Sequence, residues 1–316
     1  MLALQRDINF EDVGVILVND GEGNEIPEEH FTAYPYKVKQ ISIPKGGVSK
    51  ARNAGLDAST ADWVMFCDFD DCFSSLFGLH LIFCGIAEDK YDLLRAVFTE
   101  ETRDDDGMIH LVSHDDDTVF IHGKVMRRKF LLENGIRFHP KLTIHEDGFF
   151  NVLTYSLAKD RGQKINTPIY IWAWNDNSVV RKDRRSDFVL DTYEHLMRQR
   201  IALTEEYIKR QMPEETVLTV VKTVLDAYYD FQQHEWRTLK NKAKVEKAER
   251  WFCAYLKRYG AFYQKAELSQ IAKLAAISRG RVLMTNRMYM EGETLGDFIL
   301  RMINKVRPIP VEEQDV

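Results

Sequence analysis

Three carboxylates directly follow one of the most apolar runs of the sequence. Residues 61–73 read ADWVMFCDFDDCF, so Asp68, Asp70 and Asp71 stand at the end of a predicted buried strand. Clustered carboxylates repel one another and lose hydration when they are partly buried. A divalent cation relieves that repulsion, because Mg2+ and Mn2+ take oxygen ligands and are often held by carboxylates together with substrate phosphates. In an extended chain Asp68 and Asp70 point to the same side, so both can face one ligand.

Simpler explanations of these acids remain open at the level of sequence. Asp71 is placed to cap a helix predicted over 74–89, and that role needs no cation. Acidic turns are also common, and the chain has two others, at 104–106 and 115–117. Neither of these follows a buried strand, so we interpret both as solvated loops.

The elements that must position the acids alternate between strands and helices. Glycine-led or amphipathic patterns predict helices over 46–60 and 74–89, and 103–135 predicts a hairpin followed by a short helix. Short apolar or alternating runs predict strands over 13–20, 37–44, 62–68, 91–101 and 167–174. This order predicts an α/β domain with a mixed, mostly parallel sheet flanked by helices. Ligands collect at the carboxyl ends of such strands, and Asp20 also stands at one.

The pattern of apolar residues changes near residue 187. Long amphipathic patterns predict an all-α C-terminal region over 187–306, and 307–316 is expected to be a flexible tail. We therefore expect the α/β domain to occupy 1–186. The helical region is a candidate for shaping a ligand site or for self-association into a homo-oligomer.

Composition excludes several classes of protein. The formal net charge is -6 and the pI is about 5.9, which argues against holding duplex DNA or an anionic membrane by bulk charge. No run approaches the 18 apolar residues of a membrane span, and the N-terminus lacks a signal-peptide pattern. The cysteines show no metal-binding spacing, so we expect reduced thiols in a cytoplasmic protein; they are Cys67, Cys72, Cys84 and Cys253.

Taken together, three segments of the chain resemble a family 2 glycosyltransferase with the GT-A fold. They are VILVNDGEGNE, GGVSKARNAGLDASTADWVMFCDFDD and HGKVMRRKFLLENGIRFHPKLTIHEDGFF, in the order expected for that family. The resemblance covers roughly 1–185. The family usually begins with an earlier strand and helix, for which residues 1–12 leave no room. We therefore expect either an N-terminally shortened domain or another segment in the place of that strand.

The resemblance implies roles in donor binding. Asp20 matches the acid that hydrogen-bonds the nucleobase, although Asn19 replaces a frequent aspartate before it. Arg52 matches a basic residue near the base and phosphates, and Asp68 matches the acid on the ribose side. Arg181, in NSVVRKDRRS, stands where the family often places a pyrophosphate-binding residue on a mobile loop.

The resemblance also implies a cation and a catalytic base. Asp70 matches the metal ligand, Asp71 shares one of the acidic roles, and the expected cofactor is Mn2+ or Mg2+. Asp147, in IHEDGFF, matches the catalytic base, with Glu146 beside it as support. The implied reaction is a single inverting displacement, in which Asp147 takes the proton from an acceptor hydroxyl that attacks the sugar of a nucleotide-sugar, expected to be a UDP-sugar.

The sequence leaves the acceptor and several residues open. A glycan, a protein, a lipid carrier and a modified nucleobase are all acceptors that the chain could serve. A non-catalytic binding or assembly protein on a degraded transferase domain is the alternative function. His122 either lines the acceptor site or simply belongs to a hairpin, and His145 either contacts the acceptor or metal or only packs. Trp172 and Trp174 are expected on one side of a strand, where core packing and sugar stacking are both open.

Overall fold

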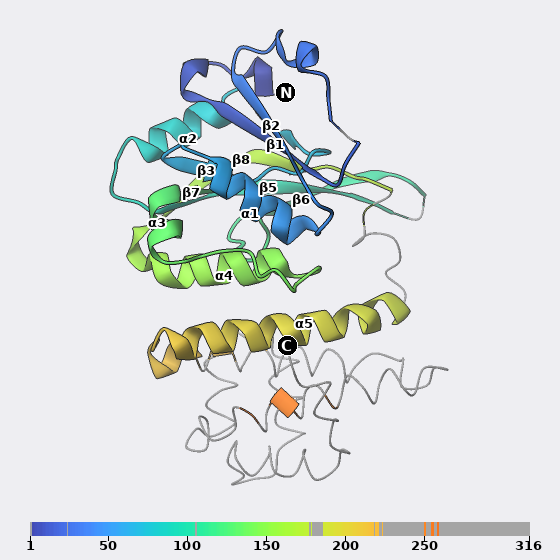
Figure 1. The fold of residues 1–316 in the computed structure, drawn as a ribbon, viewed down its shortest axis with the longest axis vertical. Coiled ribbons are helices and arrows are strands. Elements are labelled where there is room, and N and C mark those ends of the chain that lie inside the picture. The colour runs from blue at the N-terminus through green and yellow to red at the C-terminus, as the bar shows by residue number, and fades with distance from the viewer. Residues whose placement is uncertain are drawn as a thin grey trace. The chain divides into compact units, whose positions relative to one another are not determined.

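The chain divides into two units, Met1–Lys182 and Asp183–Val316. The computed structural model describes residues 2–23, 25–104, 106–176, 178 and 186–217, together with 219, 220, 223, 250, 254, 255 and 258. The first unit contains all of the described strands (Figure 1). The second unit is described through one long helix and a few residues beyond it.

The described strands and α-helices follow one another along the chain much as expected. The strands are β1 (Gly14–Asp20), β2 (Lys37–Ile43), β3 (Trp63–Met65), β4 (Cys72–Phe73), β5 (Leu93–Arg103), β6 (Ile109–His114), β7 (Lys124–Arg127) and β8 (Gly162–Trp172). The helices are α1 (Val48–Ala58), α2 (Gly78–Ile86), α3 (Arg128–Glu133), α4 (Glu146–Ala158) and α5 (Ser186–Lys209). Short 3-10 helices cover Leu2–Leu4, Phe10–Asp12, Glu28–Phe31 and Lys159–Arg161.

The strands form two separate sheets. β1 and β2 pair in parallel as a two-stranded sheet, and the other described strands form a six-stranded sheet in the order β3-β7-β5-β8-β4, with β6 on β5. The sheet is mixed, as expected, but antiparallel pairs outnumber parallel ones among the described strands, since only β5–β8 is parallel in the larger sheet. One reason is local: β5 and β6 are joined by a short turn, and a short turn can only connect antiparallel strands.

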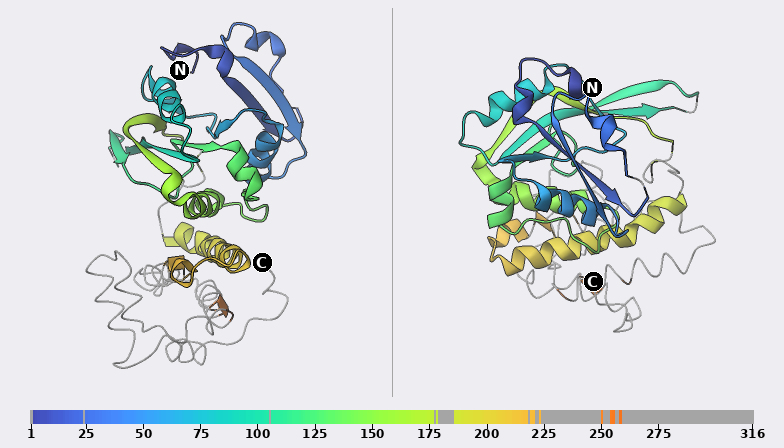
Figure 2. Two further views of the ribbon diagram at one scale, coloured as in Figure 1. Left: turned by 90° about the vertical axis from the view of Figure 1, so that its left-hand side faces the viewer. Right: turned by 45° about the horizontal axis from the view of Figure 1, so that its top comes forward.

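The small sheet is joined to the domain through α1. Figure 2 shows β1 and β2 beside the larger sheet, not within it. No residue of β1 or β2 is fully buried. A side chain on Gly55 of α1 would lie 3.3 Å from Cγ2 of Val18, so the glycine permits α1 to pack closely on β1. α1 in turn contacts the rest of the domain through Ser49, whose hydroxyl donates to the carbonyl of Leu142 at 2.8 Å.

The core of the first unit lies around β5, which is buried on both faces. Leu93 and Leu94 point to opposite faces and are 1% and 0% exposed. α2 covers one face of the sheet and α4 the other (Figures 1 and 2). α2 approaches closely, because a Cβ on Gly85 would lie 2.9 Å from Cδ1 of Leu94. This buried frame holds the strand ends that carry the acids.

The hairpin predicted in 103–135 is formed by β5 and β6. Asp104 organises its turn by accepting hydrogen bonds from the backbone N–H groups of Asp106 and Met108, at 3.1 and 2.9 Å. β6 leaves apolar side chains exposed, with Ile109 and Leu111 at 55% and 65%. β7 follows β6, and α3 is the short helix that the sequence predicts after the hairpin.

In the second unit, α5 begins the predicted helical region. Its described side chains bury one stripe that includes Met197, Ile201 and Tyr207. The hydroxyls of Thr204 and Tyr255 share a hydrogen bond of 2.7 Å within this unit. Most of 187–306 and the tail at 307–316 lie outside the described residues.

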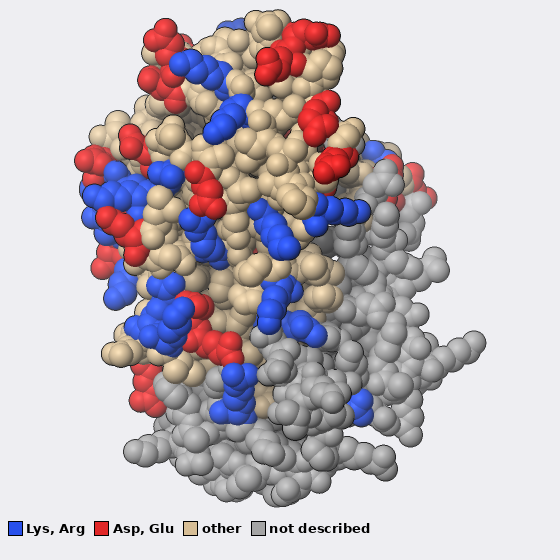
Figure 3. Space-filling view, in the orientation of Figure 1, with Lys and Arg blue, Asp and Glu red and all other residues tan. Residues whose placement is uncertain are grey.

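Charge and cysteine chemistry agree with the composition. Acidic and basic side chains are interspersed over the face of the described residues seen in Figure 3. Cys67, Cys72 and Cys84 are free, whereas Cys253 lies outside the described residues. Within the described part of the chain, no helix has both the length and the apolar character needed to cross a membrane.

Replacing Leu94 tests the position of the core. We expect Leu94→Ala to lower the free energy of unfolding by about 2 to 5 kcal/mol, because it leaves a cavity in a fully buried cluster. The matched control is Leu111→Ala on the exposed face of β6, which we expect to change stability by less than about 0.5 kcal/mol. Urea unfolding of both variants measures the difference, and equal effects would contradict this core.

Candidate functional site

The acids after β3 lie in a turn, so their side chains do not alternate as in a strand. β3 ends at Met65, three residues earlier than the predicted strand, and the N–H of Asp71 donates to the carbonyl of Asp68 at 3.2 Å. The turn brings Asp68 and Asp71 together and directs Asp70 elsewhere. The exposed Asp70 accepts a 2.6 Å hydrogen bond from the amide of Asn175.

Asp71 is fixed by residues at the end of β8. Its carboxylate accepts from the hydroxyl of Tyr170 at 2.7 Å and from the backbone N–H of Ala173 at 2.9 Å. The same Tyr170 hydroxyl accepts from the N–H of Asp68 at 3.1 Å. Burial raises the pKa of Asp71 to about 6. The capping explanation is wrong, since α2 begins at Gly78 without a side-chain cap.

His122 joins this group from the segment before β7. It is 4% exposed, and its Nδ1 lies 3.5 Å from Oδ2 of Asp71 without a hydrogen-bond partner. Burial lowers the pKa of His122 to about 4, so we regard this approach as a neutral ring beside a carboxylate and not as an ion pair. One ligand atom from each of Asp68, Asp71 and His122 falls within 4.8 Å of the others.

Aromatic rings hold His122 in place. Its ring stacks on Trp172 at 4.9 Å and on Tyr170 at 5.3 Å between centroids, and Phe98 lies at 5.2 Å. Trp172 itself packs against the buried cluster around β5. The structure thus gives Trp172 a packing role next to the acids.

Arg52 on α1 connects this group to the start of α4. Its guanidinium donates to Asp68 at 2.9 Å and to Glu146 at 2.8 Å, and it lies over the ring of Phe138 at 5.4 Å. Burial alone would lower the pKa of Arg52, but the carboxylates of Asp68 and Glu146 outweigh it and raise that pKa. Burial raises the pKa of Glu146, while Arg52 opposes that rise.

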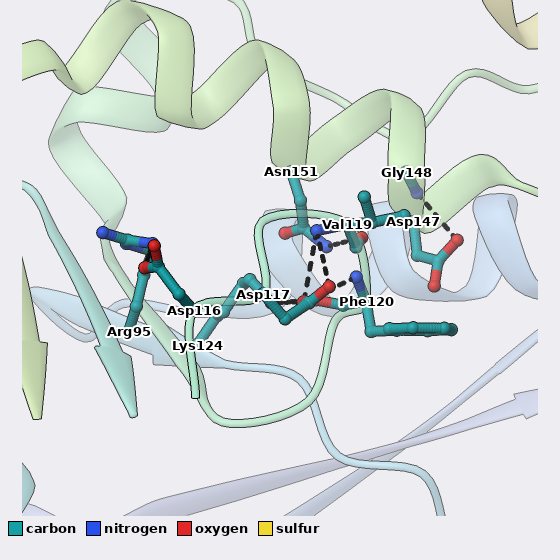
Figure 4. Close-up of polar contacts among 9 residues, drawn as sticks. All are labelled: Arg95, Asp116, Asp117, Val119, Phe120, Lys124, Asp147, Gly148 and Asn151. Atoms are coloured by element: carbon teal, nitrogen blue, oxygen red, sulfur yellow. Dashed lines mark hydrogen bonds and ion pairs between the residues drawn. The ribbon is translucent and has the colours of Figure 1, made fainter. Parts of the chain in front are cut away.

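Asp147 stands in the first turn of α4, next to Glu146. Its carboxylate accepts a 2.7 Å hydrogen bond from the N–H of Gly148 (Figure 4). Burial, reinforced by the charge of Glu146, raises the pKa of Asp147 to about 7, although Arg52 and Lys124 oppose the rise. A carboxyl with this pKa exchanges a proton near neutral pH, which suits a general base.

The acidic run at 115–117 is more ordered than a solvated loop. Asp117 accepts from the N–H groups of Val119 and Phe120 and, at 2.6 Å, from the buried ammonium of Lys124 (Figure 4). Asn151 of α4 donates to the carbonyl of Val119 at 2.7 Å. These bonds fasten the segment that carries His122 to the helix that carries Asp147. Our interpretation of a solvated loop is wrong for Asp117, because Lys124 needs a buried counter-charge.

Asp20 is used to shape the backbone before α1. Its two carboxylate oxygens accept from the N–H groups of Gly46 and Gly47 at 2.6 and 2.8 Å. Gly47 has φ +85°, a conformation that favours glycine. Asp20 therefore fixes the entry to the helix that carries Arg52. Arg181 lies outside the described residues.

The structure thus brings together most of the residues that the sequence predicts. Asp68, Asp71, Arg52, Glu146 and Asp147 form one electrostatic group, whereas Asp70 and Asp20 make their hydrogen bonds elsewhere. The position of His122 among the acids does not follow from the sequence. Its only local signal is a histidine directly before a glycine and a strand, and the contact depends on β8, far along the chain.

Comparisons with known proteins show similarity to glycosyltransferases over part of the chain. The model of the family described as Glycosyl transferase family 2 matches residues 2–83. Two proteins of Bacillus subtilis (strain 168) are similar: "Uncharacterized glycosyltransferase EpsJ", 26% identical over 191 residues, and "Minor teichoic acid biosynthesis protein GgaA", 28% identical over 169 residues. The matches cover 54% and 48% of this chain, and 55% and 38% of those proteins. The chain thus spans about half or less of the length of these curated relatives.

Solved structures show the same fold. S. aureus TarS 1-349 in complex with UDP-GlcNAc matches with a TM-score of 0.62 at 20% identity, covering 95% of this chain and 85% of that one. A second crystal structure of S. aureus TarS 1-349 gives a TM-score of 0.61 at 19% identity, with the same coverage. At this level of identity the likeness concerns the fold, and it confirms the expected GT-A-like α/β class.

Removing the Arg52 charge tests the bridge between the acids. We expect Arg52→Met to destabilise the protein by about 3 to 5 kcal/mol, because Glu146 is left as a buried, unpaired carboxylate. Adding Glu146→Gln to that variant should restore part of the loss. Urea unfolding of the two single variants and the double variant measures the coupling, and additive effects would contradict a shared buried pair.

Proposed function

We propose that this chain is a member of glycosyl transferase family 2 and that it transfers a sugar from a nucleotide-sugar donor to an acceptor hydroxyl. The observation that carries the proposal is that Asp147, whose pKa is raised to about 7, stands next to Glu146, which Arg52 joins to Asp68. A partly exposed carboxylate paired with Arg52 and a buried carboxyl with a pKa near neutrality suit different tasks in one reaction.

The donor we propose is a UDP-sugar. The similar structure of TarS 1-349 contains UDP-GlcNAc, and the shared fold supports the proposal that this chain binds the same class of donor. Asp68 is 38% exposed at its side chain and can still accept from a ligand on the oxygen that Arg52 leaves free. From the resemblance, we also assign nucleotide contacts to Asp20, Arg52 and Arg181.

A divalent cation fits the acids after β3. Clustered carboxylates and an imidazole nitrogen without a partner, all within reach of one another, form a donor set suited to such an ion. We propose Mn2+ or Mg2+, held by Asp71 with neighbouring acids. The cation would supply positive charge to the departing diphosphate. Asp70, the ligand expected from the sequence, would need to leave Asn175 to take part.

Asp147 is the proposed general base, and the reaction is a single inverting displacement. The acceptor hydroxyl would give its proton to the Asp147 carboxylate while its oxygen attacks the anomeric carbon. The bond from that carbon to the diphosphate breaks on the opposite face. Glu146 positions the base, because it is held by Arg52 and adds a negative charge that favours the protonated form of Asp147.

The remaining expectations concern the setting of the reaction. We retain the proposal that the protein acts in the cytoplasm and that the region 187–306 shapes the acceptor site or mediates self-association. The acceptor classes named from the sequence all offer a hydroxyl or an equivalent nucleophile. The alternative function, binding without catalysis, predicts that donor is held but never consumed.

Asp147→Asn separates catalysis from stability. We expect transfer to fall by about 10²- to 10⁴-fold, the usual contribution of a general base. Asn can still accept from Gly148, so the helix start is kept. A panel of nucleotide-sugars, assayed for released nucleoside diphosphate with candidate acceptors, measures the loss. Full activity in the variant would remove Asp147 from the mechanism, and no release from wild type would support the non-catalytic alternative.

At alkaline pH, Asp147→Asn should be more stable than wild type. Because the pKa of Asp147 is about 7 when folded and near 4 when unfolded, its contribution to stability falls as pH rises from about 4 to 7. Asn carries no such cost. We expect the melting temperature of Asp147→Asn at pH 8 to exceed that of wild type by at least about 2 °C, and the gain to vanish at pH 4.

The pH dependence of transfer follows from the same group. The base must be ionised, so kcat/KM should rise with pH and reach half of its plateau near pH 7 in the free enzyme. Glu146→Gln removes a neighbouring negative charge and should move this midpoint to lower pH. Steady-state kinetics from pH 5 to 9 check both, and a midpoint unchanged by Glu146→Gln would argue against this electrostatic coupling.

A further inference from the structure

We infer that His122 completes a cation site with Asp68 and Asp71, and that its ring nitrogen makes this site prefer divalent transition-metal ions to Mg2+. The inference deepens the proposed function, because it concerns the cation of the same site. It also departs from the sequence-based expectation that Asp70 is the ligand. Binding of the ion can be measured without any transfer assay, so the two proposals can fail separately.

The first support is that the three donors converge from separate parts of the chain. Asp68 and Asp71 come from the turn after β3, and His122 comes from the segment before β7. One ligand atom of each lies within 4.8 Å of the other two. Bonds of about 2.1 Å to one ion place its ligand atoms about 3 to 4 Å apart, so the group needs only a small closure to bind it.

The second support is the ring nitrogen itself. Nδ1 of His122 is buried, has no hydrogen-bond partner, and lies 3.5 Å from a carboxylate oxygen of Asp71. A buried polar atom left without a partner costs about 1 to 3 kcal/mol. The stacked rings of Trp172 and Tyr170 keep the imidazole from turning toward solvent. An ion between the imidazole and the carboxylates would satisfy this nitrogen.

The third support is the set of bonds that orient Asp71. Tyr170 and Ala173 each donate to one of its oxygens, at 2.7 and 2.9 Å. Such outer hydrogen bonds are what hold a ligating carboxylate in position at a metal. The exposed Asp70 instead accepts a hydrogen bond from the side-chain amide of Asn175. Asp71 is therefore better positioned than Asp70 to bind the cation.

The imidazole decides which ions are preferred. Mg2+ demands oxygen ligands and keeps much of its hydration shell, so a nitrogen donor contributes little to its binding. Affinity for a site with nitrogen and oxygen donors rises from Mn2+ through Fe2+ and Co2+ toward the later transition metals. We expect Mn2+ to bind at least about tenfold more tightly than Mg2+, and Co2+ more tightly than Mn2+.

The test measures Mn2+ binding to the full chain by the electron paramagnetic resonance signal of free Mn2+, with Mg2+ as competitor. His122→Phe keeps an aromatic ring in the stack and removes the nitrogen. We expect it to weaken Mn2+ binding by at least about tenfold and to leave Mg2+ binding nearly unchanged. The control Asp70→Asn alters the exposed neighbouring acid and should change Mn2+ binding by less than threefold.

The melting temperature of each variant shows whether a loss of Mn2+ binding comes from unfolding. Without metal, His122→Phe should melt at or above the temperature of wild type, because an unpartnered buried nitrogen has been removed. At the same concentration, added Mn2+ should then raise the melting temperature of wild type and of Asp70→Asn by more than that of His122→Phe. A variant that melts well below wild type is replaced by His122→Leu in the same titration.

The outcomes are distinct. Equal Mn2+ affinity in wild type and His122→Phe, or a larger loss in Asp70→Asn, would overturn this inference while leaving the transfer reaction untouched. Conversely, Mn2+ binding that depends on His122, in a protein that consumes no nucleotide-sugar, would uphold the cation site and count against the proposed function. Equal affinity of wild type for Mn2+ and Mg2+ would remove the claimed selectivity.

Discussion

One buried guanidinium holds the acidic centre of this domain together. Arg52 contacts Asp68 after β3 and Glu146 at the start of α4, two positions far apart in the chain. Carboxylates brought this close would repel one another without a positive charge between them. The helix that supplies Arg52 is itself oriented by the hydrogen bonds of Asp20 to Gly46 and Gly47. The strand end, the helix and the second acid thus depend on a single charge.

Burial divides the acids into two groups. Asp68 is partly exposed and paired with Arg52, whereas burial raises the pKa values of Asp71 and Asp147 toward neutrality. The buried Lys124 and Asp117 form a second ion pair that ties the His122 segment into this arrangement. Each of these groups costs stability that the apolar core around β5 must offset. Such a cost in stability is typical of functional sites, where ionisable groups are buried and their pKa values are shifted.

Much of this arrangement follows from sequence patterns, and the rest depends on distant contacts. Apolar runs located β1 and β2 to within a residue, because these signals are local. The turn at Asp68 was not predictable in this way, since it depends on the Tyr170 hydroxyl and the N–H of Ala173. The role of His122 depends on rings that β8 contributes. Alternation within a segment cannot report such contacts.

The two-stranded sheet has a consequence for how tightly any nucleotide could be held. β1 and β2 bury none of their residues fully and pair only with each other among the described strands, so this corner should open at a lower free energy than the frame around β5. Asp20 ends β1 and steers the loop before α1. A ligand that contacts both Asp20 and the turn after β3 must therefore order β1 and β2 when it binds. The free energy of that ordering opposes binding. The measured affinity of such a ligand reports that ordering as well as its contacts.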